Sequence, residues 1–415
     1  MRKCKVFVGS SHPELGKLVC TKLGIDPAPC TLKKFSNGET SVQIGVSVRD
    51  EDVYIIQSGS PQINDHIMEL LILISACRGG SASKITVVIP QFPYSKQSKM
   101  KKHRGAITAR MLANLLVMAG ADHIVSMDLH ASQMQGFFTK PVDNLYGAPT
   151  LAKWIRMNIP DWENAVVVSK NPGGTKRVTA LADSLKINFA MIHTDRRRTQ
   201  DGYNARNKKK PVRPSNQKKQ NLDTEYGEEE NIVSEMQTAR IVQGHVVDDD
   251  YPSHSSPAPN PTTAPAPLDG DVLGGTCDIS NSDDEDDNSS IAQEKLITLV
   301  GDVHNKVAII LDDMIDKPNS FIAAAEHLQL NCGAKAVYVV GTHGVFRDDC
   351  LEVLNDCECI DKIVVTNTYP IEVERVQNCK KLAVIDVSPI FAECIRRDHF
   401  GESISVLFDS LAAIE

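Results

Sequence analysis

The chain has 415 residues, of which 41% are hydrophobic and 24% charged, and its formal net charge at pH 7 is −8. This composition is typical of soluble globular proteins and excludes fibrous, wholly disordered and membrane-spanning classes. Single cores rarely grow beyond roughly 250 residues, so we expect two domains and an extra segment. The negative charge argues against nucleic acid as a partner, because that function usually needs a basic face.

Targeting and disulfide signals are absent from the pattern. The first apolar run, KVFVG, is too short for a signal peptide, and no later apolar stretch approaches bilayer length. We therefore expect a cytoplasmic protein with no membrane partner. The eleven cysteines are scattered through apolar segments, which predicts small buried side chains. Cys357 and Cys359 lack the partners that a zinc site needs.

Short runs rich in Val and Ile alternate with stretches of helical pattern in both halves of the chain. The first half contains CKVFVG, VYIIQS, ITVVIPQF and HIVSMDL, and the second contains AVVVSK, INFAMIH, VAIILDD, AVYVVGTHG, KIVVTNT and LAVIDVS. This alternation predicts two α/β domains with parallel sheets and crossover helices. Ligands of such sheets bind outside the carboxyl ends of the strands, so the residues after each run are the site candidates.

The alternation stops between residues 199 and 294, where a basic stretch, a proline-rich run and an acidic stretch follow one another. Such a composition buries little apolar surface and predicts a largely disordered, low-complexity insertion. Within it, TARIVQGHVV has alternating apolar residues around a glycine and could form a small hairpin. The lysine run and Ser282 also fit a nuclear address and a phosphorylation site, but charge runs in linkers usually only bind solvent.

A carboxylate and an imidazole follow the strand run HIVSMDL, at Asp128 and His130, and Asp143 comes after Pro141. The spacing of two residues points the first two side chains to one side, where they can meet a metal ion or a phosphate. A capping aspartate with a hydrogen-bonded histidine is the alternative, and the spacing alone favours it.

The full string DLHASQMQGFFTKPVDN closely resembles the signature of the ribose-phosphate diphosphokinase family. Other strings that are similar to family sequence, in family order, are FVGSSH, KKFSNGET, VYIIQSG, INDHIMELLILI, VIPQFPYSKQ, LANLLVMAGADHI, NLYGAP, THGVF, VVTNTYP, ECIRRDHFGESIS and VLF. The resemblance covers nearly all of the chain outside the insertion. It implies two type I phosphoribosyltransferase-like domains and transfer of the β,γ-diphosphoryl group of ATP, with Mg²⁺, to the C1 hydroxyl of ribose 5-phosphate.

The resemblance also implies oligomers, built from dimers into hexamers, and it divides the chain. We expect an ATP-side domain at 1–148 and a ribose-phosphate-side domain at 149–198 and 295–400. The insertion takes 199–294, and a C-terminal segment at 401–415 should return to the first domain.

On the ATP side, the resemblance assigns residues that are mostly retained. Phe35, Asn37 and Glu39 match a loop that contacts adenine across a subunit boundary, where Phe can stack and the polar groups can read the base edge. Lys96 and Gln97 stand where the family usually has an Arg–Gln pair, so the charge survives without the bidentate fork. The resemblance further implies metal ligands at Asp128, His130 and Asp143, and a γ-phosphate contact from His130.

On the sugar side, three loops depart from the family pattern, of which two come first in the chain. The diphosphate loop has Asn171 in place of an aspartate that binds Mg²⁺, ahead of Gly173 and Gly174. A flexible catalytic loop after INFAMIH has Thr194 where the family has a lysine, although the second cation remains as Arg196. Loss of one such cation can cost roughly 10³-fold in rate, by analogy with arginine fingers.

The resemblance assigns the ribose hydroxyls to acids that follow the run VAIILDD, namely Asp312, Asp313 and Asp316. The next loop should bind the 5-phosphate, but it reads Lys317, Pro318, Asn319 and Ser320. Proline has no N–H, and asparagine takes glycine's backbone angles less freely, so we expect a damaged phosphate site.

Residues that match a regulatory phosphate or ADP site of the family are retained, namely Ser47, Arg49, Ser81, Arg104, Ser403 and Ser405. Three interpretations follow. The chain is an active enzyme in which Arg196, Lys176 and Lys317 compensate for the losses, or a weak subunit that completes a catalytic paralogue's ATP site in a hetero-oligomer, a hexamer or larger. A phosphoribosyltransferase, the third, should keep its phosphate loop and needs no ATP-site sequences. Three separate losses in one site favour the second interpretation.

Overall fold

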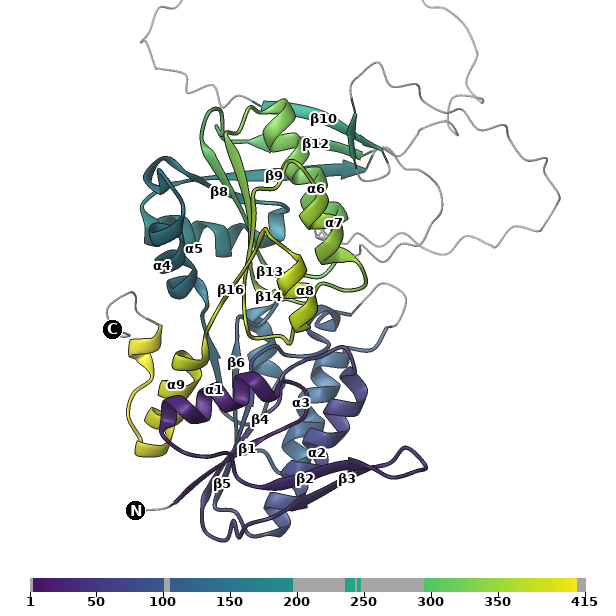
Figure 1. Ribbon diagram of the computed structural model, residues 1–415, viewed down its shortest axis with the longest axis vertical. Helices are drawn as coiled ribbons and strands as arrows, with labels where there is room; N and C mark the ends of the chain where they lie inside the picture. Colours follow the sequence, from purple (N-terminus) through teal and green to yellow (C-terminus); the bar gives the residue numbers. More distant parts are fainter. Residues whose placement is uncertain (1–2, 101–104, 197–235, 243–244, 248–294, 409–415) are drawn as a thin grey trace, which may run out of the picture.

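The computed structural model describes residues 3–100, 105–196, 236–242, 245–247 and 295–408, which form two lobes, one above the other (Figure 1). Arg104, Ser282 and most of the expected insertion lie outside the described residues. Of Arg196 only the backbone is described. Within the described ranges, none of the helices has both the length and the apolar character needed to cross a membrane.

The first lobe is built on a sheet of five described strands, all parallel. In spatial order they are β1 (Cys4–Val8), β4 (Asp52–Ile56), β5 (Lys84–Ile89), β6 (His123–Met127) and β7 (Val142–Leu145). One face is covered by α2 (Ile63–Gly79) and α3 (Thr108–Ala119), the other by α1 (Pro13–Leu23) and α9 (Ser388–Phe400). Buried residues alternate between the two cores, as Val6 and Phe7 do along β1, because successive side chains of a strand point to opposite faces.

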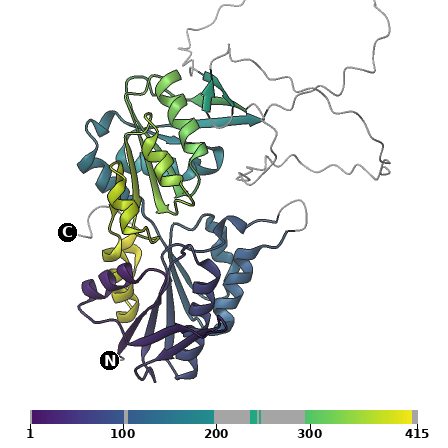
Figure 2. The same cartoon turned by 45° about the vertical axis from the view of Figure 1, so that its right-hand side comes forward.

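Helix α9 comes from the end of the described chain, yet it lies beside α1 on the first lobe (Figures 1 and 2). Phe391 and Ile395 of α9 are buried in one core with Leu15 and Val19 of α1. The return to the first lobe therefore begins near Val387, earlier than the expected 401–415. The apolar pattern of a helix shows that one face is buried, but not which sheet that face covers.

The second lobe contains a larger sheet whose central strands are parallel, as predicted. In spatial order its described strands are β11 (His245–Val247), β10 (Met236–Val242), β12 (Lys295–Val300), β9 (Asn188–Arg196), β8 (Val166–Ser169), β13 (Val307–Ile315), β14 (Ala336–Gly344), β15 (Lys362–Thr366) and β16 (Leu382–Ile385). One face is covered by α4 (Ala148–Asn158) and α5 (Thr175–Leu185), the other by α6 (Asn319–Glu326) and α7 (Cys350–Asp356). The short helix α8 (Val373–Asn378) precedes β16.

One edge of this sheet is antiparallel, and part of the expected disordered insertion belongs to it. Strand β12 pairs antiparallel with β9 and with β10, and β10 forms a hairpin with β11. The possible hairpin in TARIVQGHVV is thus present, and the expectation of disorder is wrong for residues 236–242 and 245–247. Alternating apolar residues fit a half-buried strand, which overrides the composition of the surrounding segment.

A separate hairpin, β2 (Cys30–Lys34) and β3 (Thr40–Ile44), projects sideways from the first lobe (Figure 1). Its loop turns at Gly38, whose φ of 89° favours glycine, and the Phe35 amide donates to the Glu39 carbonyl oxygen. The described cysteines are mostly buried, as predicted. Burial raises the pKa of the Cys77 thiol to about 12, so that group stays protonated.

Candidate active site

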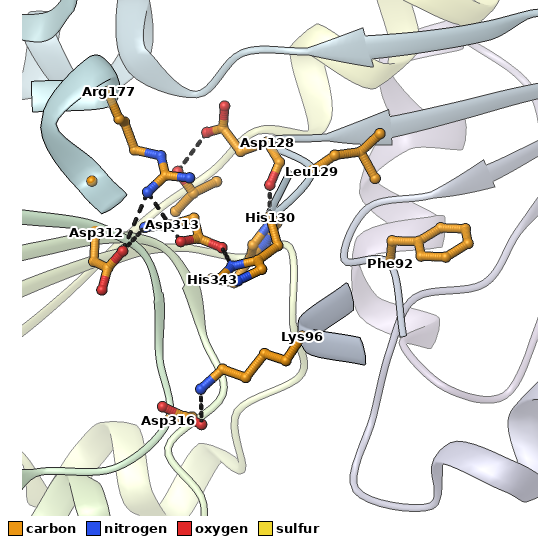
Figure 3. A network of polar contacts seen from close by, with 12 residues as sticks. Phe92, Lys96, Asp128, Leu129, His130, Arg177, Asp312, Asp313, Asp316 and His343 are labelled. Carbon is orange, nitrogen blue, oxygen red and sulfur yellow. Dashed lines mark hydrogen bonds and ion pairs between the residues drawn. The ribbon is translucent and has the colours of Figure 1, made fainter. Parts of the chain in front are cut away.

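The carboxyl ends of β6 and β13 face each other where the two lobes meet (Figure 3). Nδ1 of His130, after β6, lies 2.8 Å from Oδ2 of Asp313 on β13. Nζ of Lys96 in the first lobe donates to Oδ2 of Asp316 at 2.6 Å. The structure thus brings together residues that the sequence placed on the ATP side and on the sugar side, as expected for the carboxyl ends of parallel strands.

Asp128 acts as a capping group at the end of β6. Its Oδ2 accepts hydrogen bonds from the Gly147 amide at 3.0 Å and from Oγ1 of Thr342 at 2.5 Å. Next to it, His343 of β14 is buried and its Nε2 lies 3.0 Å from the Met127 carbonyl oxygen. Burial lowers the pKa of His343, so a neutral ring donates this bond. The residues of the second lobe therefore fix the strand end that carries Asp128.

Asp143, the third expected metal ligand, lies elsewhere. Its Oδ2 is 2.8 Å from Nε2 of His123, whose Nδ1 is 3.2 Å from Asp398 of α9. These contacts belong to the interface between the first sheet and α9. The set Asp128, His130 and Asp143 does not assemble, and no group of three His, Cys, Asp or Glu side chains among the described residues is arranged to hold a metal ion.

The adjacent acids Asp312 and Asp313 of β13, the second of them buried, lie among cations. Asp312 pairs with Nζ of Lys170 at 3.1 Å and with Nη1 of Arg177 at 3.2 Å. Arg177 also lies 3.0 Å from Oδ1 of Asp313 (Figure 3). Burial alone would raise the pKa of Asp313, but the charge of Arg177 and the contact with His130 outweigh it and hold that pKa well below its ordinary value. Asp313 is therefore ionised and carries the charge that organises this part of the site.

Asn171 is turned back on its own loop. Its side-chain Oδ1 accepts a hydrogen bond from the Gly174 amide at 3.0 Å, at the start of the helical turn that leads into α5. An aspartate would accept the same bond and would add a negative charge that Asn lacks. The loop therefore keeps the shape of a phosphate-binding turn before a helix, but without the anionic group.

The expected phosphate loop at the end of β13 is bonded within the chain. The Lys317 amide donates to Oδ1 of Asp316 at 2.9 Å, and Pro318 supplies no N–H before α6 begins at Asn319. Oγ of Ser320 accepts from Nζ of Lys170 at 3.0 Å. The two loops of the sugar side are thus tied together by a lysine that precedes Asn171.

Thr194 and Arg196 belong to β9, rather than to a flexible loop as expected. The backbone of Thr194 is paired with Ile297 and that of Arg196 with Lys295, because β12 extends the sheet along this segment. Thr194 is exposed. At this position the chain therefore presents an uncharged threonine where the family has a lysine.

With this arrangement described, comparison with known proteins decides the family. The N-terminal domain of ribose phosphate pyrophosphokinase matches residues 4–120, and the phosphoribosyl synthetase-associated domain matches residues 161–249 and 242–409. Ribose-phosphate pyrophosphokinase 1 of Saccharomyces cerevisiae is 68% identical over 430 aligned residues, covering all of both chains. The chain belongs to the ribose-phosphate pyrophosphokinase family.

Further relatives agree with this family assignment. Ribose-phosphate pyrophosphokinase 1 of Schizosaccharomyces pombe is 53% identical over 98% of this chain and 99% of its own. The crystal structure of phosphoribosylpyrophosphate synthetase from Mycobacterium smegmatis matches with a TM-score of 0.69 at 29% identity, covering 96% of this chain and 100% of that one. The predicted fold, with two type I phosphoribosyltransferase-like lobes, is confirmed.

In this pyrophosphokinase chain, the residues expected to bind adenine lie in the projecting β2–β3 hairpin. The side chain of Phe35 is 58% exposed, and Oδ1 of Asn37 accepts from the Glu39 amide at 3.1 Å. Lys96 and Gln97 instead belong to a short helical turn, where Gln97 accepts from Oγ1 of Thr108. The structure therefore joins Lys96 to the sugar-side acids and leaves the hairpin loop on the surface.

The residues expected to bind a regulatory phosphate or ADP fall into two groups. In the first lobe, the loop of Ser47 and Arg49 meets Ser81, because the Asp50 amide donates to the Ser81 carbonyl oxygen at 3.0 Å. After α9, the hydroxyls of Ser403 and Ser405 lie 2.8 Å apart. Arg104, the remaining residue of the expected site, lies outside the described residues.

Sequence reasoning missed the roles of Lys170, Arg177 and His343. Arg177 follows Gly174 by three positions, so helical spacing could have placed it over the same loop. Lys170 directly follows a buried strand, which is the position where ligands of parallel sheets bind. His343 lies within the quoted string THGVF, but only the fold shows that it contacts the end of β6.

Proposed function

We propose that this chain is a subunit of an enzyme that makes 5-phosphoribosyl 1-diphosphate from ATP and ribose 5-phosphate, and that it is weak or inactive alone. Its activity then depends on a hetero-oligomer, a hexamer or larger, with a catalytic paralogue. The observation that carries the proposal is the set of contacts made by the residues expected to bind the sugar and the diphosphate. The acids of β13 are held by Lys170 and Arg177, while Asn171 offers no carboxylate.

In the proposed reaction, the C1 hydroxyl oxygen of the sugar attacks the β-phosphorus of ATP. The bond between the β-phosphorus and the oxygen that bridges to the α-phosphorus breaks, AMP leaves, and the hydroxyl proton is released. Such transfers depend on positioning and on cations around the phosphates. In this chain Lys96, Arg177 and Arg196 are the cations proposed for that role, with His130 near the γ-phosphate.

Mg²⁺ is proposed as a companion of ATP. Metal ligands of this kind usually include only one or two protein carboxylates, and water and phosphate oxygens complete the shell. The described residues do not fit a protein cage, since Asp143 is committed to His123 and Asp128 to capping contacts. Bound together with ATP, the metal would neutralise part of the phosphate charge.

The loss of sugar-side groups supports weak intrinsic activity. Thr194 stands in place of a cation, and the loop from Lys317 to Ser320 contains a residue with no N–H. Each loss removes stabilisation from the same transition state, and the loss of one cation alone costs roughly 10³-fold by analogy with arginine fingers. Losses within one transition-state apparatus rarely leave an efficient enzyme.

Full activity of the chain alone is the second candidate function. Lys176 is exposed in the first turn of α5, close in sequence to the diphosphate loop. Together with Arg196 and Lys317 it would then have to replace the missing charges. The ion pairs of Lys170 and Arg177 with Asp312 argue against this candidate, because they engage Arg177, a cation proposed for the reaction, and occupy an acid proposed to hold the ribose.

The proposed contribution of this chain to a hetero-oligomer is the β2–β3 hairpin. Phe35, Asn37 and Glu39 are presented on the surface, where they can complete an ATP site in a neighbouring subunit. Retention of the proposed regulatory residues fits a role in assembly and feedback. The proposed location is the cytoplasm, where ATP and ribose 5-phosphate are available to nucleotide biosynthesis.

Formation of 5-phosphoribosyl 1-diphosphate by the purified chain tests the proposal. We expect little product from the chain alone and efficient formation after mixing with the other family members of the same cell. Those members must also be measured without this chain, so that its contribution is seen directly. A turnover rate of the isolated chain comparable to that of the mixture would overturn the proposal in favour of the second candidate.

A further inference from the structure

Lys170 is anchored by three contacts in the sugar side of the site. It follows β8, and its ammonium lies 3.1 Å from Oδ2 of Asp312 and donates to Oγ of Ser320 at 3.0 Å. The same ammonium lies 4.1 Å from the centroid of the Phe321 ring, a distance that gives a cation–π contact. The side chain is only 11% exposed, so these groups have largely replaced water around the charge.

The carboxylate that Lys170 contacts is already heavily engaged. Oδ1 of Asp312 accepts from the Asp313 amide at 2.8 Å and lies 3.2 Å from Nη1 of Arg177. Lys170 engages the second oxygen, Oδ2. A hydrogen bond between two charged groups is roughly twice as strong as one between neutral groups. A sugar hydroxyl that approaches Asp312 must therefore compete with two cations for the same oxygens.

Ser320 adds a second reason why Lys170 opposes sugar binding. Ser320 lies in the first turn of α6, at the end of the loop proposed to take the 5-phosphate. Lys170 uses this hydroxyl as an acceptor, and it bridges the hydroxyl to the acid that would hold the ribose ring. The lysine thus spans both ends of the proposed ribose 5-phosphate position, with its stem along the ring of Phe321.

We propose that Lys170 is a specificity-determining residue that excludes ribose 5-phosphate from this chain by occupying Asp312 in its place. The inference deepens the proposed function, on which it rests for the identity of the sugar. It explains the weak activity proposed for the chain alone, because the chain would bind ribose 5-phosphate poorly, whereas ATP binding would not be affected. The sugar must displace an ammonium that is largely buried and is held by Asp312, Ser320 and Phe321.

The opposite role, in which Lys170 binds the sugar phosphate, predicts a change of sugar affinity in the opposite direction when Lys170 is removed. If Lys170 were a ligand of the 5-phosphate, its removal would weaken sugar binding. If Lys170 occupies the sugar's position, its removal strengthens that binding. The variant Lys170→Met keeps an unbranched apolar stem against Phe321 and removes the charged ammonium together with its hydrogen-bond donors.

The experiment is calorimetric titration of the full chain with ribose 5-phosphate. We expect Lys170→Met to bind the sugar at least about tenfold more tightly than the unchanged chain, which corresponds to about 1.4 kcal/mol. Lys335→Met is the matched control, because Lys335 is exposed and precedes β14 at the end of the sheet opposite the site. This control should leave the affinity unchanged. Equal or weaker binding by Lys170→Met would overturn the inference.

A second variant and a second titrant complete the test. Lys170→Gln also removes the charge while keeping hydrogen-bond donors, so it should strengthen sugar binding even if the methionine variant does not fold. Inorganic phosphate should gain less affinity than the sugar with either variant, because phosphate can use only the released Ser320 hydroxyl, whereas the sugar hydroxyls also gain Asp312. A gain for phosphate equal to that for the sugar would contradict the inference.

Failure of the proposed function remains distinguishable from failure of this inference. The inference concerns the affinity of the isolated chain for the sugar, whereas the proposed function concerns product formation in the mixture of subunits. Tighter sugar binding by Lys170→Met with no effect of the chain on the mixture would contradict only the proposed function. Unchanged sugar binding in a chain that supports the mixture would contradict only the role of Lys170.

Discussion

Nδ1 of His130 lies 2.8 Å from Oδ2 of Asp313, although 183 positions separate the two residues in the sequence. The contact joins the end of β6 in the first lobe to the end of β13 in the second. Through Asp313 it extends to Arg177 and from there to Asp312. A single buried carboxylate thus connects the proposed phosphate side of the site to its sugar side.

Replacing Asp313 by Asn should lower the free energy of unfolding by about 3 kcal/mol, because it removes one partner from a buried set of charges. Asp316→Asn is the matched control, since its pair with Lys96 is partly exposed and should contribute less than about 1 kcal/mol. Urea unfolding followed by circular dichroism measures both changes. If both variants lowered the free energy of unfolding equally, Asp313 would contribute no more to stability than the partly exposed Asp316.

Restoring the missing groups should raise the activity of the isolated chain. The double variant Asn171→Asp and Thr194→Lys returns a carboxylate and a cation to positions where the folded backbone already accepts them. Asp can accept the same hydrogen bond from Gly174 that Asn accepts now, and Thr194 is exposed on β9. We expect product formation to rise at least about tenfold, measured by release of AMP. No increase in a variant that unfolds at the original temperature would argue that other losses dominate.

Stability should fall as the pH rises from 6.5 to 9. Burial lowers the pKa of His123, but hydrogen bonds to Asp143 and Asp398 outweigh burial and raise it to about 9, from an ordinary value of 6.5. The folded chain therefore holds this proton more tightly than the unfolded chain. The resulting stabilisation is complete below pH 6.5 and is lost as the pH passes 9, with a total on the order of 3 kcal/mol.

Urea unfolding at a series of pH values checks this dependence, with His123→Gln as the comparison. The variant should be less stable at pH 6.5, and its stability should change less between pH 6.5 and 9. If the free energy of unfolding of the variant changed with pH as steeply as that of the unchanged chain, groups other than His123 would cause the pH dependence. Helix α9 should be the first element affected, because Asp398 belongs to it.

Replacing Phe35 by Ala should reduce product formation by the mixed subunits while leaving the chain's thermal unfolding unchanged. The ring is 58% exposed, so its removal costs the fold little, whereas stacking on a base contributes about 1–3 kcal/mol. A loss of about tenfold or more is expected. Phe189→Ala is the matched control, because that ring is 50% exposed but lies on β9 of the second lobe. An equal loss for both variants would contradict the role of the hairpin.

The sequence predicted the features that depend on local pattern. Runs of β-branched residues predicted strands such as β6 and β13, and the rule that ligands bind at the carboxyl ends made His130 and Asp313 site candidates. Only the fold shows that the two side chains are in contact. The resemblance to the family predicted that the departures at Asn171, at Thr194 and in the loop Lys317–Ser320 fall within the active site. The structure confirmed the α/β class and the hairpin at TARIVQGHVV.

Features that depend on tertiary arrangement were beyond this reasoning. Asp143 was expected near Asp128, but the partner that holds it, His123, is set by the face of the sheet on which α9 lies. Lys170 was not among the residues that the sequence singled out. Its contact with Asp312 depends on the register between β8 and β13, which pairs Ser169 with Leu311 and which the individual strand patterns do not specify.

Because α9 returns to the first sheet, the chain passes between the lobes twice, once after β7 and once before α9. In the sequence, the second lobe is thus inserted between two segments of the first lobe. Two covalent connections between the lobes restrain the twisting and sliding of one lobe relative to the other more than a single connection would. Hydrogen bonds from Nε2 of His12 to the Asn367 carbonyl oxygen and from Oγ of Ser58 to the Thr368 carbonyl oxygen reinforce this restraint. A break in either crossing would leave the first lobe without one of its pieces, so both lobes are expected to unfold together.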